Sequence, residues 1–123
     1  WLLALAAFSI GCGMRMLDPL LPMLAAAFGV GLGEAATLIA GFAIAYGMGQ
    51  LASGPLGDRY GKPRVAAVAV ILYAAVTAGA SLAGSLGALL AMRVLAGLVA
   101  AAVIPLLMAH IADSLPYAQR QGV

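Results

Sequence analysis

The 123-residue chain is 65% hydrophobic and only 8% charged, and its formal net charge is +2. Soluble domains carry about a quarter charged residues, so this composition excludes a water-soluble globular protein. A nucleic-acid binder is also excluded, because the few basic residues lie in short clusters beside apolar runs. Long runs of Ala, Leu, Val and Gly instead predict an all-α membrane protein.

The apolar runs predict four transmembrane helices, which we expect at residues 2–28, 35–53, 65–83 and 88–112. Pro19 and Pro22 are expected to bend the second half of the first helix. Glycines end that helix, and Gly54-Pro55 end the second one. Residues 113–123 are expected to begin a linker into a missing part of the protein, and further residues are expected before position 1, because the chain starts without Met inside an apolar run.

The densest charge lies in the predicted loop 54–64, which contains Asp58, Arg59, Lys62 and Arg64. The loops after the first and third helices contain neither Lys nor Arg. Because short basic loops stay on the cytoplasmic side, we expect the N-terminus, loop 54–64 and the C-terminal tail with Arg120 to be cytoplasmic.

Three charged residues remain inside the predicted helices, Arg15 and Asp18 in the first and Arg93 in the fourth. Each costs roughly 2.5 to 3.5 kcal/mol to place in a membrane and therefore needs a partner or water. Asp18 and Arg93 fall in the same half of the bilayer, so we expect them to face one cavity. Asp18 is a candidate proton-binding group; a fixed ion pair and recognition of a charged substrate are the alternatives.

Other polar residues in the helices are few. Tyr46 and Gln50 share one face of the second helix and are candidates for the same cavity or for polar helix packing. The third helix is expected to be peripheral or to face lipid. Two pairs of small residues, Gly47 with Gly54 and Gly97 with Ala101, are expected to allow close helix packing.

Loop 54–64 also carries a specific motif. Its residues Gly54, Leu56, Asp58, Arg59, Gly61 and Lys62 match the pattern G-x-L-a-D-r-x-G-r-k, with Pro63 in place of the second basic residue. In this motif the chain resembles the major facilitator superfamily. The segment from Arg93 to Gly97 is similar to that family's R-x-x-x-G, and the segment from Asp113 to Arg120 to its D-x-x-p-x-x-x-R ending. The charged, Pro-containing segment 15–22 resembles the first helix of many bacterial members.

The resemblance implies alternating access, in which two six-helix halves move about a central site. The four predicted helices are then an incomplete N-terminal half, of the drug/proton-antiporter type, in a bacterial inner membrane. The resemblance also implies a cytoplasmic gating motif. It contains Gly54, Gly61 and Lys62 of the loop, together with a charge cluster formed by Asp58, Arg59, Asp113 and Arg120. Arg93 would serve in proton coupling.

The partners implied are protons, a small-molecule substrate, the lipid bilayer and the missing remainder of the transporter. Two intramembrane arginines against one aspartate leave an organic anion open as the substrate. No cofactor and no metal are expected, and the sequence contains no catalytic pattern of an enzyme. Two alternatives remain: a complete four-helix multidrug transporter built from copies of itself, and a membrane scaffold or assembly subunit without transport.

Overall fold

The computed structural model of the protein describes residues 2–114, and within that range it is helical and contains no strand. The helices are α1 (Leu2–Arg15), α2 (Leu21–Phe28), α3 (Leu32–Ala35), α4 (Thr37–Tyr60), α5 (Lys62–Ala80), α6 (Leu86–Ala100) and α7 (Val103–Ser114). Three stretches are long and apolar enough to cross a membrane, namely Leu32–Tyr60, Lys62–Ala80 and Leu86–Ser114, and a shorter apolar helix covers Leu3–Arg15. The predicted all-α membrane fold is confirmed.

The first predicted helix, 2–28, is not continuous. It is interrupted by turns at residues 16–20, between α1 and α2. Pro19 lacks the N–H that would bond to the Arg15 carbonyl, and Pro22 lies in the first turn of α2, where a missing N–H costs nothing. The two prolines therefore break the helix instead of bending it.

The predicted loop 54–64 is mostly helical, because α4 continues through Pro55 to Tyr60 and α5 begins at Lys62. The Pro55 ring lies on the exposed side, and Gly57 on the other side is buried against Leu106 of α7, which holds the last turns of α4 in the bundle. Only Gly61, at a φ of 92°, leaves helical geometry. A residue with a side chain is disfavoured at this φ, so a glycine is needed for the reversal.

The fourth predicted helix, 88–112, is also divided, into α6 and α7. The interruption at Ala101 and Ala102 lies just before Pro105, whose ring prevents the usual bond to the Ala101 carbonyl four residues earlier. At the start of α6, the Ser85 side chain accepts a hydrogen bond from the Ala88 N–H. This N-cap explains why the helix begins at Leu86, two residues before the predicted start.

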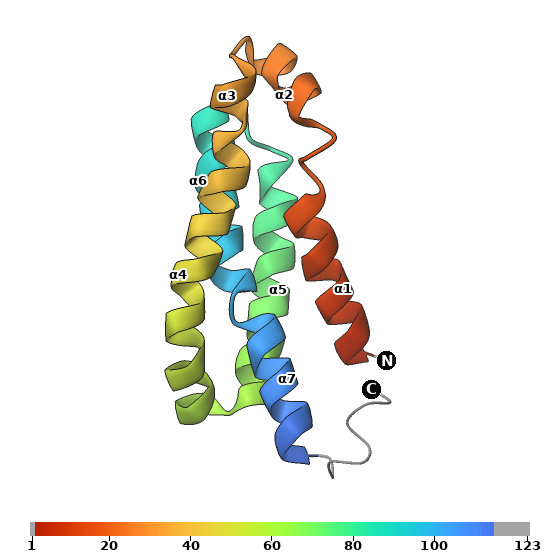
Figure 1. The fold of residues 1–123 in the computed structure, drawn as a ribbon, viewed down its shortest axis with the longest axis vertical. Coiled ribbons are helices and arrows are strands. Elements are labelled where there is room, and N and C mark those ends of the chain that lie inside the picture. The colour runs from red at the N-terminus through yellow and green to blue at the C-terminus, as the bar shows by residue number, and fades with distance from the viewer. Residues whose placement is uncertain (1, 115–123) are drawn as a thin grey trace.

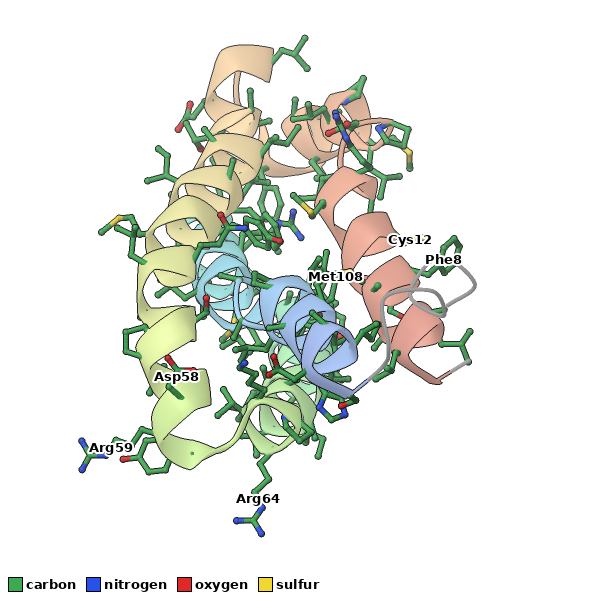
Figure 2. The ribbon with its side chains drawn as sticks, turned by 60° about the horizontal axis from the view of Figure 1, so that its bottom comes forward. Phe8, Cys12, Asp58, Arg59, Arg64 and Met108 are labelled. Carbon is green, nitrogen blue, oxygen red and sulfur yellow. The ribbon has the colours of Figure 1, made fainter. Side chains whose placement is uncertain are left out.

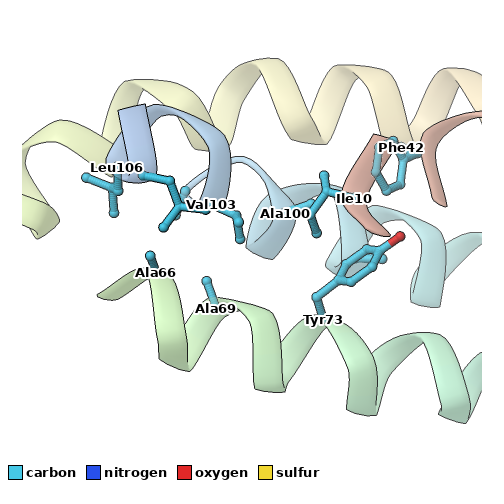
Figure 3. Packing of buried hydrophobic residues seen from close by; sticks show 11 residues of the cluster. Ile10, Phe42, Ala66, Ala69, Tyr73, Ala100, Val103 and Leu106 are labelled. Atoms are coloured by element: carbon cyan, nitrogen blue, oxygen red, sulfur yellow. The ribbon is translucent and has the colours of Figure 1, made fainter. Parts of the chain in front are cut away.

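The longer helices run side by side along the long axis of the molecule (Figure 1). The short helices α2 and α3 lie at one end, whereas the start of α1, the α4–α5 turn and the end of α7 lie at the other. The core between α1, α4, α5, α6 and α7 contains small and aliphatic side chains with two aromatic rings (Figure 3). Its labelled members are Ile10, Phe42, Ala66, Ala69, Tyr73, Ala100, Val103 and Leu106.

Glycines allow α4 and α6 to approach closely. A Cβ on Gly97 would lie 2.4 Å from the Phe42 carbonyl oxygen, and one on Gly49 would lie 2.8 Å from that of Leu98. The expected packing role of Gly97 and Ala101 agrees with their burial. Within the described residues, Gly47 and Gly54 do not serve close helix packing, because both are exposed there and a Cβ on either would meet nothing within 4 Å.

Candidate functional site

Arg93 is the main candidate for a functional side chain inside the bundle. It is 4% exposed and lies on α6, where the surrounding residues are apolar. Its Nη1 donates a hydrogen bond to the main-chain oxygen of Gly13 in α1, at 3.2 Å. Its Cζ lies 4.3 Å from the centre of the Phe42 ring of α4, in a cation–π contact. One cation thus connects α1, α4 and α6.

Arg93 is only partly satisfied by these contacts. Its Nε and Nη2 atoms have no hydrogen-bond partner in the part of the chain that the structure describes, and neither do the buried hydroxyls of Tyr73 and Thr77 on α5. Nε and Nη2 form the edge of the guanidinium that can hold a carboxylate with two parallel hydrogen bonds. The donors that remain free on Arg93 are therefore the ones best suited to an acidic partner.

A cavity of about 330 Å³ lies beside Arg93. Its wall is apolar except for the side chains of Arg93, Thr77 and Ser81. The remaining lining residues come from the α1–α2 region, α5, its connection to α6, and α6, and they include Met16, Leu17, Phe28, Ala80 and Met92. An apolar cavity with a few polar groups is the usual form of a small-molecule site.

Asp18 lies in the break between α1 and α2, where its Oδ2 accepts a hydrogen bond from Nη1 of Arg15 at 3.2 Å. Both side chains are accessible, and this ion pair lies at a second, smaller pocket that Phe42 also lines. No hydrogen bond joins Asp18 to Arg93 in the described residues, although the two charges attract each other electrostatically. Asp18 and Arg93, which were expected to face one cavity, therefore line different pockets, and Phe42 borders both groups.

The other two cavity candidates do not line the cavity at Arg93. Tyr46 is half-buried and packs in parallel with Phe42, with ring centres 6.1 Å apart. Gln50 is exposed. Tyr46 thus supports the aromatic ring on which Arg93 rests, which is an indirect contribution to the site.

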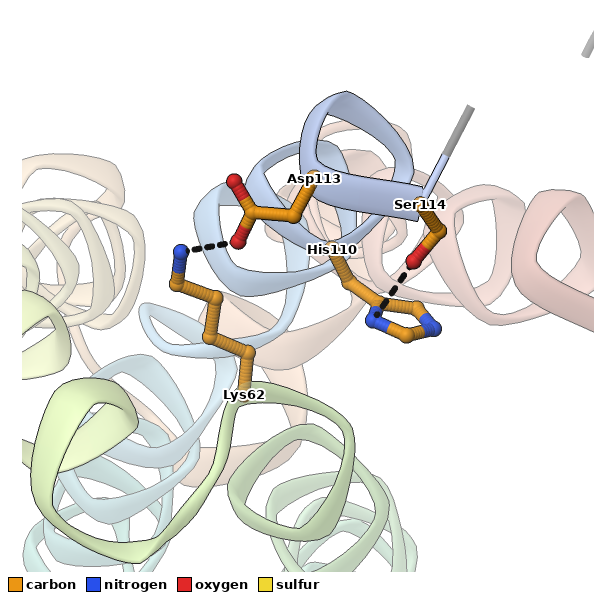
Figure 4. Close-up of polar contacts among 4 residues, drawn as sticks. All are labelled: Lys62, His110, Asp113 and Ser114. Atoms are coloured by element: carbon orange, nitrogen blue, oxygen red, sulfur yellow. Dashed lines mark hydrogen bonds and ion pairs between the residues drawn. The ribbon is translucent and has the colours of Figure 1, made fainter. Parts of the chain in front are cut away.

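The candidate gating residues lie at the opposite end of the bundle. Lys62 at the start of α5 donates to Oδ2 of Asp113 near the end of α7, and on the same helix Nδ1 of His110 lies 3.4 Å from the Ser114 hydroxyl (Figure 4). Asp58 and Arg59 are exposed, and Arg120 lies outside the described residues. Gly54 is exposed, and Gly61 forms the turn. The fold therefore brings together Lys62 of the loop 54–64 motif and Asp113 of the separate motif at 113–120.

Sequence reasoning missed Gly13 and Phe42, which are the direct contacts of Arg93. A glycine carbonyl and an apolar ring in a hydrophobic run carry no signal of a polar contact. A glycine inside a helix, as at Gly13, is the one sequence feature that could have marked a place where another element comes close. Among the described residues, no three His, Cys, Asp or Glu side chains gather to hold a metal ion.

Comparison with known proteins establishes the family. The family model of the Major Facilitator Superfamily matches residues 3–123, so the chain belongs to that superfamily, and with its apolar helices it is part of a multi-pass integral membrane protein. It is 29% identical over 125 residues to an uncharacterized MFS-type transporter, Rv1250, of Mycobacterium tuberculosis. That alignment covers 98% of this chain and 21% of the relative, so the chain spans about a fifth of the relative's length. No solved structure matches the chain significantly.

Proposed function

We propose that the chain is part of the N-terminal half of a secondary active transporter, which exchanges protons for drugs or other small organic solutes by alternating access. Family membership supports the transport role. The observation that carries the proposal is the burial of Arg93, 4% exposed, with two of its nitrogen atoms unbonded within the described residues. A buried cation with unsatisfied donors is costly, so such residues in membranes generally belong to substrate or ion pathways.

Arg93 and Asp18 are the proposed coupling residues. When Asp18 is charged, its attraction holds Arg93 beside the cavity, where the Nε and Nη2 edge that is unbonded in the described residues can act on the substrate. When Asp18 binds a proton, that attraction disappears, Arg93 is no longer held there, and the substrate is released. Proton binding and substrate binding then alternate at one site, which is the requirement for antiport.

The cytoplasmic cluster is the proposed gate. The Lys62–Asp113 ion pair fastens α5 to α7, and Asp58, Arg59 and Arg120 are proposed to join this cluster when the second half of the transporter packs against it. The N-terminus, the α4–α5 connection with the gate, and the C-terminal tail are proposed to lie in the cytoplasm of a bacterium. The reason is that the basic residues gather at that connection.

The experiment uses the full-length natural protein that contains these residues, reconstituted in lipid vesicles. Transport of ethidium, a cationic probe, and of benzoate, an anionic one, is measured under an imposed pH gradient and, separately, as exchange of labelled for unlabelled probe without a gradient. Asp18→Asn is expected to abolish transport driven by the gradient and to preserve exchange. Arg93→Gln is expected to reduce both processes, since Arg93 is proposed to act on the substrate in both.

Ser9→Ala is the matched control, because Ser9 is an exposed polar residue of α1 whose hydroxyl, within the described residues, donates to the Leu5 carbonyl of its own helix. This variant is expected to transport like the wild type. Retention of full gradient-driven transport in Asp18→Asn would refute proton coupling through that residue. Absence of transport of both probes by the intact, folded protein would favour the scaffold alternative.

A further inference from the structure

Another cavity, separate from those at Arg93 and Asp18, lies on the outer surface, where α4 ends and α5 begins. Its volume is about 370 Å³, and it is lined by Tyr60, Arg64, Val65 and Val68. The Tyr60 and Val68 side chains are both 56% exposed, so the groove is open to the surroundings of the bundle. It lies at the other end of the molecule from the α1–α2 break, and it shares no lining residue with the cavity at Arg93.

The lining of the groove changes from polar to apolar along α5. Arg64 lies in the first turn, Val65 and Val68 follow toward the middle of the helix, and the exposed Ile71 and Leu72 continue the apolar surface by another turn. Tyr60 contributes an amphipathic ring at the polar end, as tyrosines do at the boundary between headgroups and hydrocarbon. The groove thus has a polar end and an apolar end, which correspond to the headgroup and the acyl chains of a lipid, with the polar end at the membrane surface.

The charge of the groove is positive. Arg59 and Arg64 point away from the helix bundle (Figure 2), and neither forms an ion pair among the described residues. The Arg59 guanidinium lies 5.4 Å from the centre of the Tyr60 ring, which places a second cation beside the groove. Lys62 is neutralised by Asp113. Asp58 is the other carboxylate of this segment, and it lies on the inner side of α4 relative to Arg59 in Figure 2.

We infer that this groove binds one anionic phospholipid, with its phosphate on Arg64, its headgroup region beside Arg59 and Tyr60, and an acyl chain along Val65 and Val68. Charge complementarity and the apolar continuation along α5 determine this choice. A guanidinium holds phosphate oxygens through parallel hydrogen bonds. A soluble phosphate compound has no acyl chain that could contact Val65 and Val68, whereas a phospholipid has one. The inference concerns an interaction with the bilayer and does not depend on the proposed transport function.

The test is native mass spectrometry of the full-length natural protein in detergent, titrated with phosphatidylglycerol and with phosphatidylcholine of identical acyl chains. The anionic lipid is expected to bind roughly fivefold more tightly, the effect of about one basic residue at a membrane surface. Arg64→Gln is expected to remove this preference, whereas Arg64→Lys retains part of it. Since Arg64 is exposed, these substitutions are expected to leave folding intact, which a thermal melt checks.

Arg15→Gln is the control, because Arg15 is equally an exposed arginine but ends α1 at the α1–α2 break, away from the groove, with 86% of its side chain accessible. It is expected to leave the preference unchanged. The inference is overturned if Arg64→Gln binds phosphatidylglycerol as the wild type does, as it would if another part of the protein covers the groove. It is also overturned if Arg15→Gln causes the same loss, which would indicate attraction by net charge alone.

Discussion

Nη1 of Arg93 in α6 donates its hydrogen bond to the main-chain oxygen of Gly13 in α1, 3.2 Å away. Tyr73 of α5 contacts the same glycine, since a Cβ placed on Gly13 would lie 1.6 Å from the tyrosine Oη. The backbone of α1 is therefore in contact with a buried cation and a buried phenol at one residue. This is possible only because that residue has no side chain.

We predict that Gly13→Ala destabilises the protein by about 1–3 kcal/mol, the usual cost of overpacking. The thermal midpoint of the full-length protein measures this effect. Gly11→Ala is the control, because a Cβ at Gly11 would meet nothing within 4 Å. Adding Tyr73→Phe to Gly13→Ala is expected to recover part of the loss, since the Tyr73 hydroxyl has no hydrogen bond in the described residues. Equal midpoints for the two alanine variants would contradict the contact.

A second prediction concerns the α4–α6 contact. Gly97→Ala should destabilise by about 1–3 kcal/mol, because its Cβ would press against the backbone of α4 at the Phe42 carbonyl. Gly47→Ala on the exposed face of α4 should instead be neutral or stabilising by up to about 1 kcal/mol, the difference in helix propensity. Chemical denaturation of both variants in detergent compares them. A stable Gly97→Ala protein would mean that the two helices lie further apart than described.

The Lys62–Asp113 ion pair predicts a charge-reversal result. Lys62→Asp places two like charges together and should lower the thermal midpoint slightly, because the pair is exposed. Adding Asp113→Lys should restore part of the loss, and the effect should shrink as the salt concentration rises. Lys62→Asp and Asp113→Lys each serve as the control for the double variant. Strictly additive losses would show that the two side chains do not interact.

The orientation of the bundle is tested by labelling. In a Cys12→Ser background, Arg59→Cys is expected to react with a membrane-impermeant maleimide only in inverted vesicles, and Glu34→Cys only in right-side-out vesicles. Both positions are exposed, and they lie at opposite ends of the bundle. The reason is the concentration of basic residues near Arg59, which favours the cytoplasmic side. The reverse labelling pattern would place the gate outside the cell.

The membrane fold could be predicted because the apolar runs and their lengths can be read directly from the sequence. The family could be predicted because its loop motif lies in one short segment. The interruptions of the helices could not. Pro55 lies inside α4, whereas Pro105 lies in the first turn of α7, just after the break that separates it from α6. Near Pro55, Gly57 packs against Leu106, and such a contact between residues far apart in the sequence is not visible in the local pattern.

The candidate site was predictable in its charged members and not in their partners. Burial of Arg93 followed from its place in an apolar run, but Gly13 and Phe42 bind it through a carbonyl oxygen and a ring face. These groups occur in almost every membrane helix, so the sequence does not distinguish them. Asp18 was expected to lie in a continuous first helix and to face one cavity with Arg93, whereas it lies in the break at residues 16–20 and pairs with Arg15.

The single non-helical residue between α4 and α5 has a mechanical consequence. With Gly61 as the whole connection, α4 cannot slide along α5 without unwinding a turn of one of them. The one-residue connection therefore keeps α4 and α5 in one register, and the ion pair of Lys62 with Asp113 joins their bend to the end of α7. Three helix ends are thus tied together at one point of the bundle.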